Sequence, residues 1–204
     1  MEEFNRRLSN AVSQLKIGMP WTKAVSITPL AEPAKPYYLN DVISDALSHG
    51  ARVINRTDEE ESSFESLVKP AIVYPVNKDM QLYHEEQFGP VIPVVPFDQL
   101  DTPVSFITDS PYGQQVSIFS EDSKNIAYLI DVLNGEVGKI NINSQCQRGP
   151  DSFAFSGRKD SAEGTLSIDE ALLAFSTDSV IATRENESNR KYLKQSWRKI
   201  NLNV

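Results

Sequence analysis

This 204-residue sequence has one cysteine and two histidines, and it has no long apolar run. The single cysteine, Cys146, excludes an internal disulfide and is typical of a reducing compartment. The two histidines, His49 and His84, lie far apart with no cysteine cluster near either, so we expect no metal site. No apolar run is long enough to cross a bilayer, and the opening residues do not resemble a secretory signal peptide. We therefore expect a cytoplasmic protein without a membrane partner.

The sequence also has neither of the two common phosphate-binding patterns, G-x-G-x-x-G and G-x-x-x-x-G-K-[S/T]. A formal net charge of −8 argues against nucleic acid or an anionic membrane as the main partner. Hydrophobic residues make up 40% and charged residues 24% of the chain, which is ordinary for a globular protein with a real core. Composition thus excludes several classes of function without choosing one.

Short apolar runs alternate with helical patterns along the chain. Apolar residues at helical spacing predict helices from residue 4 to 15, from the N-cap Asn40 to Gly50, from 123 to 133 and from 168 to 175. Runs rich in β-branched residues predict strands at residues 52–54, 71–74, 91–95, 115–119 and 140–142. Pro93 and Pro96 cannot donate ladder hydrogen bonds, so the third of these strands should be short or lie at an edge. This alternation predicts an α/β fold with a three-layer, largely parallel, doubly wound sheet.

Residues 1–183 are predicted to form one domain, and residues 184–204 a polar, net-basic tail. The domain ends in the run Val180 to Thr183, whose β-branched residues suit pairing with another strand. The acidic segment from Asp58 to Glu61 is predicted to be a solvated loop.

The loop from Asn143 to Gly164 is the strongest candidate for a ligand site on chemical grounds. It follows the end of a predicted strand, which is the usual place for ligands in an open α/β sheet. Arg148, Arg158 and Lys159 give it three cations that suit a phosphate or a carboxylate. The alternative is a surface loop whose cations are only solvated, and spacing alone does not separate the two.

Two other features have a plain interpretation when only their spacing is considered. Cys146 reads as a small residue of a polar loop, because a reactive thiolate needs a cationic neighbourhood. Glu85 and Glu86 read as a solvated pair before a turn, because adjacent carboxylates rarely face one site.

Five ordered segments together resemble the aldehyde dehydrogenase superfamily across nearly the whole chain. The family patterns are L-K-V-G-x-P, a helix ending in G-A-x-V, E-E-x-F-G-P-V, G-x-V-x-I-N and F-x-G-x-K-x-S. The matching segments are Leu15–Pro20, Asp41–Val53, Glu85–Val91, Gly138–Asn143 and Phe155–Ser161. The resemblance implies the C-terminal, catalytic and oligomerisation part of such an enzyme, truncated at its N-terminal side.

A narrower resemblance lies in residues 147–155, Q-R-G-P-D-S-F-A-F. This segment is similar to R-G-x-D-x-F-P-F of the NADP-dependent, non-phosphorylating glyceraldehyde-3-phosphate dehydrogenases. In that group the arginine helps to hold the substrate phosphate, which implies a substrate-binding role for Arg148. The resemblance also implies that the substrate mouth is lined by Asn143, Ser144, Gln145 and Cys146. Ala154 in place of proline, and Ala162-Glu163-Gly164 in place of S-G-x-G, depart from the pattern.

The resemblance further implies which residues contact NADP (or NAD) in the complete enzyme. Glu86 corresponds to the glutamate that binds the ribose beside the nicotinamide, and Phe88 to the phenylalanine that packs near the nicotinamide ring. The nucleophilic cysteine, the general base, the oxyanion asparagine and the dinucleotide domain lie N-terminal to the matched region, and Cys146 does not align with that nucleophile.

The family pattern therefore implies no catalytic residue within these 204 residues. We expect the chain to be inert alone, with no cofactor bound, and to act on an aldehyde only as part of a complete enzyme. Self-association as a homodimer or tetramer is implied as well. The alternative left open is a non-catalytic oligomerisation or interaction module derived from an aldehyde dehydrogenase.

Overall fold

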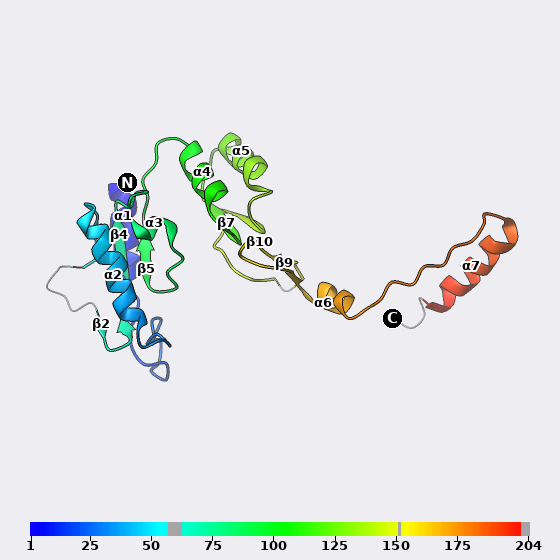
Figure 1. Ribbon diagram of the computed structural model, residues 1–204, viewed down its shortest axis with the longest axis horizontal. Coiled ribbons are helices and arrows are strands. Elements are labelled where there is room, and N and C mark those ends of the chain that lie inside the picture. The colour runs from blue at the N-terminus through cyan, green and yellow to red at the C-terminus, as the bar shows by residue number, and fades with distance from the viewer. Residues whose placement is uncertain (57–62, 151, 201–204) are drawn as a thin grey trace. The chain divides into compact units, whose positions relative to one another are not determined.

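The computed structural model describes residues 1–56, 63–150 and 152–200, and it divides into two compact units (Figure 1). Unit 1 is Met1–Ser110 and unit 2 is Pro111–Val204, and each is described by itself. The predicted acidic loop from Asp58 to Glu61 lies outside the described residues. The single domain predicted for residues 1–183 spans both units and stays a prediction.

Unit 1 is built on a three-stranded sheet in the order β1-β4-β5, of which β4 and β5 are labelled in Figure 1. Its strands and principal helices are α1 (Glu2–Ser13), α2 (Lys35–Ser48), β1 (Arg52–Val53), β4 (Ala71–Tyr74), β5 (Val91–Pro93) and α4 (Asp101–Asp109). The central strand β4 pairs antiparallel with β1 and parallel with β5. Strand β5 is only three residues long and lies at the edge of this sheet, as its proline predicted.

Alternate residues of β4 point to opposite faces of this sheet, and each face is covered by a helix. Val73 packs in one core cluster with Leu39 and Val42 of α2, all of them fully buried. Ile72 packs in a second cluster with Val12 of α1. Each such side chain stabilises the fold by roughly 1.5–3 kcal/mol relative to leaving it in water. Within unit 1 the sheet therefore carries helix on both faces.

Two helices of unit 1, α2 and α4, differ from the sequence prediction. Helix α2 begins at Lys35 with Ala34 as its N-cap, so the predicted start at Asn40 is wrong. Pro36 stands in the first turn, where its fixed φ and missing N–H suit a helix start, so it opens the helix instead of preceding it. Helix α4 was not predicted from the sequence. Its N-cap, Leu100, makes no side-chain capping hydrogen bond, so the usual start signal is absent there.

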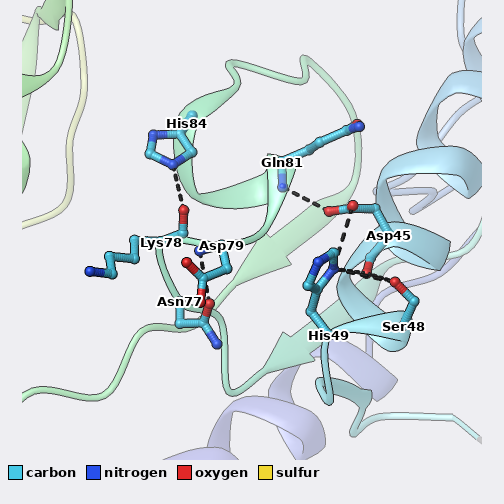
Figure 2. Close-up of polar contacts among 8 residues, drawn as sticks. All are labelled: Asp45, Ser48, His49, Asn77, Lys78, Asp79, Gln81 and His84. Carbon is cyan, nitrogen blue, oxygen red and sulfur yellow. Dashed lines mark hydrogen bonds and ion pairs between the residues drawn. The ribbon is translucent and has the colours of Figure 1, made fainter.

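A short helix, α3 (Gln81–His84), leads from β4 toward β5 and is joined to α2 by a hydrogen bond (Figure 2). The carboxylate of Asp45 on α2 accepts a hydrogen bond from the backbone N–H of Gln81. The His84 ring nitrogen Nε2 lies 2.8 Å from the carbonyl oxygen of Lys78. The remaining strands of unit 1, β2 (Ser63–Phe64) and β3 (Leu67–Val68), form an antiparallel hairpin.

Unit 2 begins with a parallel β–α–β element. Strands β7 (Gln115–Ile118) and β8 (Lys139–Ile142) pair in parallel over four residues, and α5 (Ser123–Leu133) connects them. Asp122 caps this helix, because its carboxylate accepts hydrogen bonds from the N–H groups of Lys124 and Asn125. The predicted helix 123–133 is confirmed residue for residue.

Four two-residue strands bring the segment after β8 back onto this element. Strand β6 (Tyr112–Gly113) pairs with β10 (Arg158–Lys159), and β9 (Phe155–Ser156) pairs with β11 (Thr165–Leu166). The backbone approach is close, because a Cβ built at Gly138 would lie 2.0 Å from the carbonyl oxygen of Ser156. Lys159 adds an ion pair with Glu136, with 2.9 Å between Nζ and Oε2.

The strand pairings of the two units are partly parallel and partly antiparallel. The two longest ladders, β4–β5 and β7–β8, are parallel as predicted. The other four named ladders of the described residues are antiparallel, each over two residues. The chain is therefore α/β, and a single doubly wound sheet in three layers stays a prediction.

The C-terminal part of the chain differs most from the prediction. Helix α6 (Ile168–Ala174) is capped by the Ser167 hydroxyl, and the predicted helix here is confirmed. Residues 180–183 have no regular structure within the chain, because a strand exists only with a partner. The predicted polar, net-basic tail, residues 184–204, contains the helix α7 (Glu187–Ile200).

Candidate functional site

The ends of β7 and β8 in unit 2 are joined by Asn143. Its backbone N–H donates to the carbonyl of Ile118 at 2.8 Å. Its side chain forms two hydrogen bonds with Ser120: Oδ1 accepts from the N–H at 2.9 Å, and Nδ2 donates to the carbonyl at 3.0 Å. The φ of Asn143 is +48°, in the left-handed region that asparagine adopts more easily than most residues. Asn143 therefore fixes the point at which the candidate loop leaves the sheet.

Cys146 lies over the polar face of the two strands. Its Sγ is 3.2 Å from the Ser117 hydroxyl oxygen and 3.7 Å from Nδ2 of Asn141. Asn141 is only 7% exposed, and its Nδ2 also donates to the carbonyl of Val116 at 3.1 Å. Cys146 itself is exposed, so the thiol is both anchored to the sheet and accessible to solvent.

Lys139 of β8 holds the residue before Arg148 and the residue after it. The Lys139 ammonium donates to the carbonyl of Gln147 at 3.1 Å and to that of Gly149 at 3.0 Å. The amide of Gln147 receives a further hydrogen bond from Gln145 at 3.2 Å. The backbone that carries Arg148 is therefore attached to the strand below it.

Arg148 lines a hollow of about 470 Å³ in unit 2. Its guanidinium carbon lies 5.4 Å from the ring centroid of Phe155, a cation–π distance. The other lining residues are mostly apolar and come from β11 and α6 as well as from the loop: Phe153, Leu166, Ser167, Ile168 and Ala171. Among the described residues of this lining, Arg148 carries the only charge, so it would hold an anionic group in the hollow.

The predicted cofactor residues lie in unit 1, on the segment between α3 and β5. Glu86 is exposed, whereas its neighbour Glu85 accepts a hydrogen bond from the Tyr38 hydroxyl. Phe88 is 75% exposed and has a φ of +44°, which costs a non-glycine residue about 1–3 kcal/mol. A Cβ built at the next residue, Gly89, would lie 2.6 Å from the buried side chain of Leu39. This tight turn presents a carboxylate and an aromatic ring to solvent. The carboxylate suits the hydroxyls of a sugar, and the ring suits a flat heterocycle.

The structure therefore places the predicted residues in two groups. The substrate-mouth residues share one loop in unit 2: Asn143, Ser144, Gln145, Cys146 and Arg148. Glu86 and Phe88 share one turn in unit 1. Sequence reasoning missed the role of Lys139, Asn141 and Ser117. The available signal was the period of two along β8, which puts residues 139 and 141 on one face.

The described residues contain neither a cluster of metal-binding side chains nor a membrane-spanning helix. Among residues 1–56, 63–150 and 152–200, no group of three or more His, Cys, Asp or Glu side chains could hold a metal ion. In the same ranges no helix is long and apolar enough to span a membrane.

The sequence of this chain is similar to those of known enzymes. The aldehyde dehydrogenase family profile matches residues 1–181. An NADP-dependent glyceraldehyde-3-phosphate dehydrogenase of Streptococcus equinus is 32% identical over 176 residues, which are 86% of this chain and 36% of that protein. The enzyme of that name from Zea mays is 29% identical over 167 residues, 82% of this chain and 32% of that protein.

Two solved structures agree with these relatives. The NADP complex of the NADP-dependent glyceraldehyde-3-phosphate dehydrogenase from Bacillus halodurans has a TM-score of 0.77 and 31% identity, over 85% of this chain and 35% of that one. A succinate-semialdehyde dehydrogenase from Burkholderia pseudomallei has a TM-score of 0.75 and 26% identity, over 84% of this chain and 35% of that one.

The fold, the ordered motifs and these matches define the α/β fold of the aldehyde dehydrogenases. The chain belongs to the aldehyde dehydrogenase family. It spans about a third of the length of the curated relatives it matches, and helix α7 lies beyond the matched residues.

Proposed function

We propose that this chain is the C-terminal portion of an NADP-dependent aldehyde dehydrogenase that oxidises glyceraldehyde 3-phosphate to 3-phosphoglycerate. The observation that carries the proposal is the position of Arg148. This residue lies on the loop that follows the β–α–β element, and its side chain lines a hollow. A guanidinium can make two charge-assisted hydrogen bonds to a phosphate group, which suits a small phosphorylated aldehyde.

In this proposal the loop after β8 forms the substrate mouth. Arg148 holds the phosphate of the substrate, and the exposed residues Ser144, Gln145 and Cys146 line the path to it. Asn143 acts through the two hydrogen bonds from its side-chain amide to the backbone of Ser120, which set where the loop begins. Cys146 contributes a polar wall and no nucleophile, because its position does not match that of the family's reactive cysteine.

Glu86 and Phe88 are proposed to contact the cofactor. When bound, NADP supplies the acceptor for the hydride that leaves the aldehyde. The Glu86 carboxylate would accept hydrogen bonds from ribose hydroxyls, and the Phe88 ring would flank the nicotinamide. The backbone strain at Phe88 supports this role, because a strained non-glycine residue persists where its position is used.

The reacting groups are not among the residues of this chain that match the family. In the complete enzyme a thiolate, a general base and an oxyanion donor come from the region that precedes the matched one. We propose that these 204 residues shape the substrate and cofactor pockets, are inert alone and, as the composition suggests, act in the cytoplasm.

Replacing Arg148 tests the proposal. We expect Arg148→Leu to weaken binding of 3-phosphoglycerate to the chain roughly ten- to hundredfold, because one charge-assisted contact is typically worth ~1.5–3 kcal/mol. Glycerate, which lacks the phosphate, should bind equally to both proteins. In a complete enzyme the same change should raise the KM for glyceraldehyde 3-phosphate and spare unphosphorylated aldehydes. Arg184→Leu, which removes the same charge beyond the family match, serves as the control.

Isothermal titration of both ligands decides the outcome. If Arg148→Leu affects the two ligands equally, or neither, Arg148 is not the phosphate ligand and the assignment to this substrate is wrong.

A second candidate function is a non-catalytic oligomerisation or interaction module. The observation that favours it is the apolar surface between residues 166 and 181, where Phe175 is 95% and Val180 is 87% exposed. The reading frame immediately before Met1 separates the two functions. A frame that encodes a cysteine motif and a dinucleotide domain supports the enzyme, and a true start codon without a companion gene supports the module.

A further inference from the structure

Lys139 stands at the first position of β8 and reaches from the strand into the candidate loop. Its ammonium donates to two carbonyl oxygens, those of Gln147 at 3.1 Å and Gly149 at 3.0 Å. These are the carbonyls of the residues on either side of Arg148. The same ammonium lies 5.9 Å from the centroid of the Phe153 ring, which belongs to the wall of the hollow. The Lys139 side chain thus interacts with Gln147 before Arg148 and with Gly149 and Phe153 after it.

The neighbours of Lys139 on the sheet hold the same loop. Asn141, two residues along β8, lies 3.7 Å from Cys146 Sγ through its Nδ2. Ser117 is paired with Asn141 in the register of β7 and β8, and its hydroxyl is 3.2 Å from the same sulfur. The loop from residue 146 to 149 is therefore attached at several points to one polar face of the sheet.

We propose that Lys139 is a positioning residue for Arg148. Charge-assisted hydrogen bonds from an ammonium to two carbonyls are stronger than neutral ones, and here they fix the backbone of residues 147–149. With its backbone fixed, the Arg148 side chain lies against Phe155 and borders the hollow before any ligand binds. A site that is already ordered loses less conformational entropy when it binds an anion, so its affinity is higher. The ligand in this argument rests on the proposed function, whereas the anchoring of the loop does not.

Three variants of the full chain separate anchoring from a general effect on folding. Lys139→Met removes both donated hydrogen bonds while it keeps a long apolar stem, and Lys139→Arg keeps a cation that can donate to both carbonyls. Lys124→Met, on the exposed side of α5, is the matched loss of charge within the same unit.

Nuclear magnetic resonance on each protein gives two readouts, backbone order and phosphate affinity. In the original chain the N–H groups of Arg148 and Gly149 should have order parameters near ~0.85, and Lys139→Met should lower them toward ~0.6 or below. Titration with inorganic phosphate should give a dissociation constant roughly tenfold higher for Lys139→Met than for the original chain. Lys139→Arg should restore both values, Lys124→Met should change neither, and the amides of β7 should keep their order throughout.

The outcomes are distinct. Unchanged order at residues 148 and 149 in Lys139→Met overturns the proposal, and so does an equal loss of order in β7, which would mean a general defect in folding. Loss of loop order in Lys139→Met, together with no phosphate binding by the original chain, supports the anchoring role and contradicts the proposed substrate.

Discussion

The Asp45 carboxylate of α2 accepts a hydrogen bond from the backbone N–H of Gln81, the first residue of α3, at 2.8 Å (Figure 2). Met80, the N-cap residue of α3, makes no side-chain capping hydrogen bond, and Asp45, 36 residues before Gln81, supplies the capping acceptor from α2. Its second carboxylate oxygen is 3.5 Å from Nδ1 of His49, and the Ser48 hydroxyl donates to its backbone carbonyl at 2.7 Å. The start of α3, and with it the approach to the Glu86–Phe88 turn, depends on this carboxylate.

Removing this cap should destabilise unit 1. We expect Asp45→Ala to lower the free energy of unfolding by about 1 kcal/mol, the usual cost of losing an N-cap acceptor. Asp45→Asn should lose less, because its amide oxygen can still accept from Gln81. Denaturant unfolding followed by circular dichroism measures the change, with Asp41→Ala, one turn earlier on the exposed side of α2, as the control. Equal stability of Asp45→Ala and Asp41→Ala would mean that the cap has no energetic role.

A methyl group at residue 138 should disrupt unit 2. The added Cβ of Gly138→Ala would lie 2.0 Å from the carbonyl oxygen of Ser156, and backbone atoms cannot move aside without breaking the β9–β11 pairing. We expect a loss of stability of at least ~1–3 kcal/mol, the usual range for overpacking. Gly164→Ala is the control, because a Cβ there has nothing within 4 Å. If both variants unfold at the same denaturant concentration, the close approach at residue 138 is not real.

Self-association should follow from the apolar surface of the C-terminal segment. Ile168, Leu172 and Leu173 of α6 are each more than 60% exposed, as are Phe175 and Ile181 after it. Large exposed apolar side chains gathered in one segment often mark an interface, so we expect a dimer or larger species at micromolar concentration by light scattering. The double change Val180→Asp and Ile181→Asp should shift the mass toward the monomer, and Thr177→Asp should not. A monomer mass for the unaltered chain would remove this segment as a driver of association.

Catalysis by the chain alone is not expected. Cys146 has Ser117 and Asn141 as its polar neighbours, and neither can act as a base that removes the thiol proton. Incubation with NADP and any aldehyde should therefore produce no NADPH above the rate without protein, followed by NADPH absorbance. Formation of NADPH that Cys146→Ser abolishes would identify this thiol as a nucleophile and reverse its assignment.

Local patterns in the sequence were enough for several elements. The helix from 123 to 133 has apolar residues at helical spacing, and the carboxylate of Asp122 caps its first turn. Both signals involve only residues within one helical turn of each other. The strand at 71–74 is a short apolar run with three buried residues, and the strand at 115–118 has the β-branched residues Val116 and Ile118 at alternate positions. The family motifs likewise predict a substrate-binding role for Arg148 and the loop around it, and this role stays a prediction. These features need no information from distant residues.

Tertiary structure alone decided the rest. The pairing of β9 with β11 and of β6 with β10 joins two-residue segments too short to show a period, so only their partners define them as strands. Whether the cation of Lys139 is solvated or anchored depends on the path of a loop eight to ten residues later. The sequence by itself determined the family, the regular elements and the chemistry of the loop, because these follow from local periodicity and residue type. The structure decided which side chain holds that loop in place, because such a contact exists only after the chain has folded back on β8.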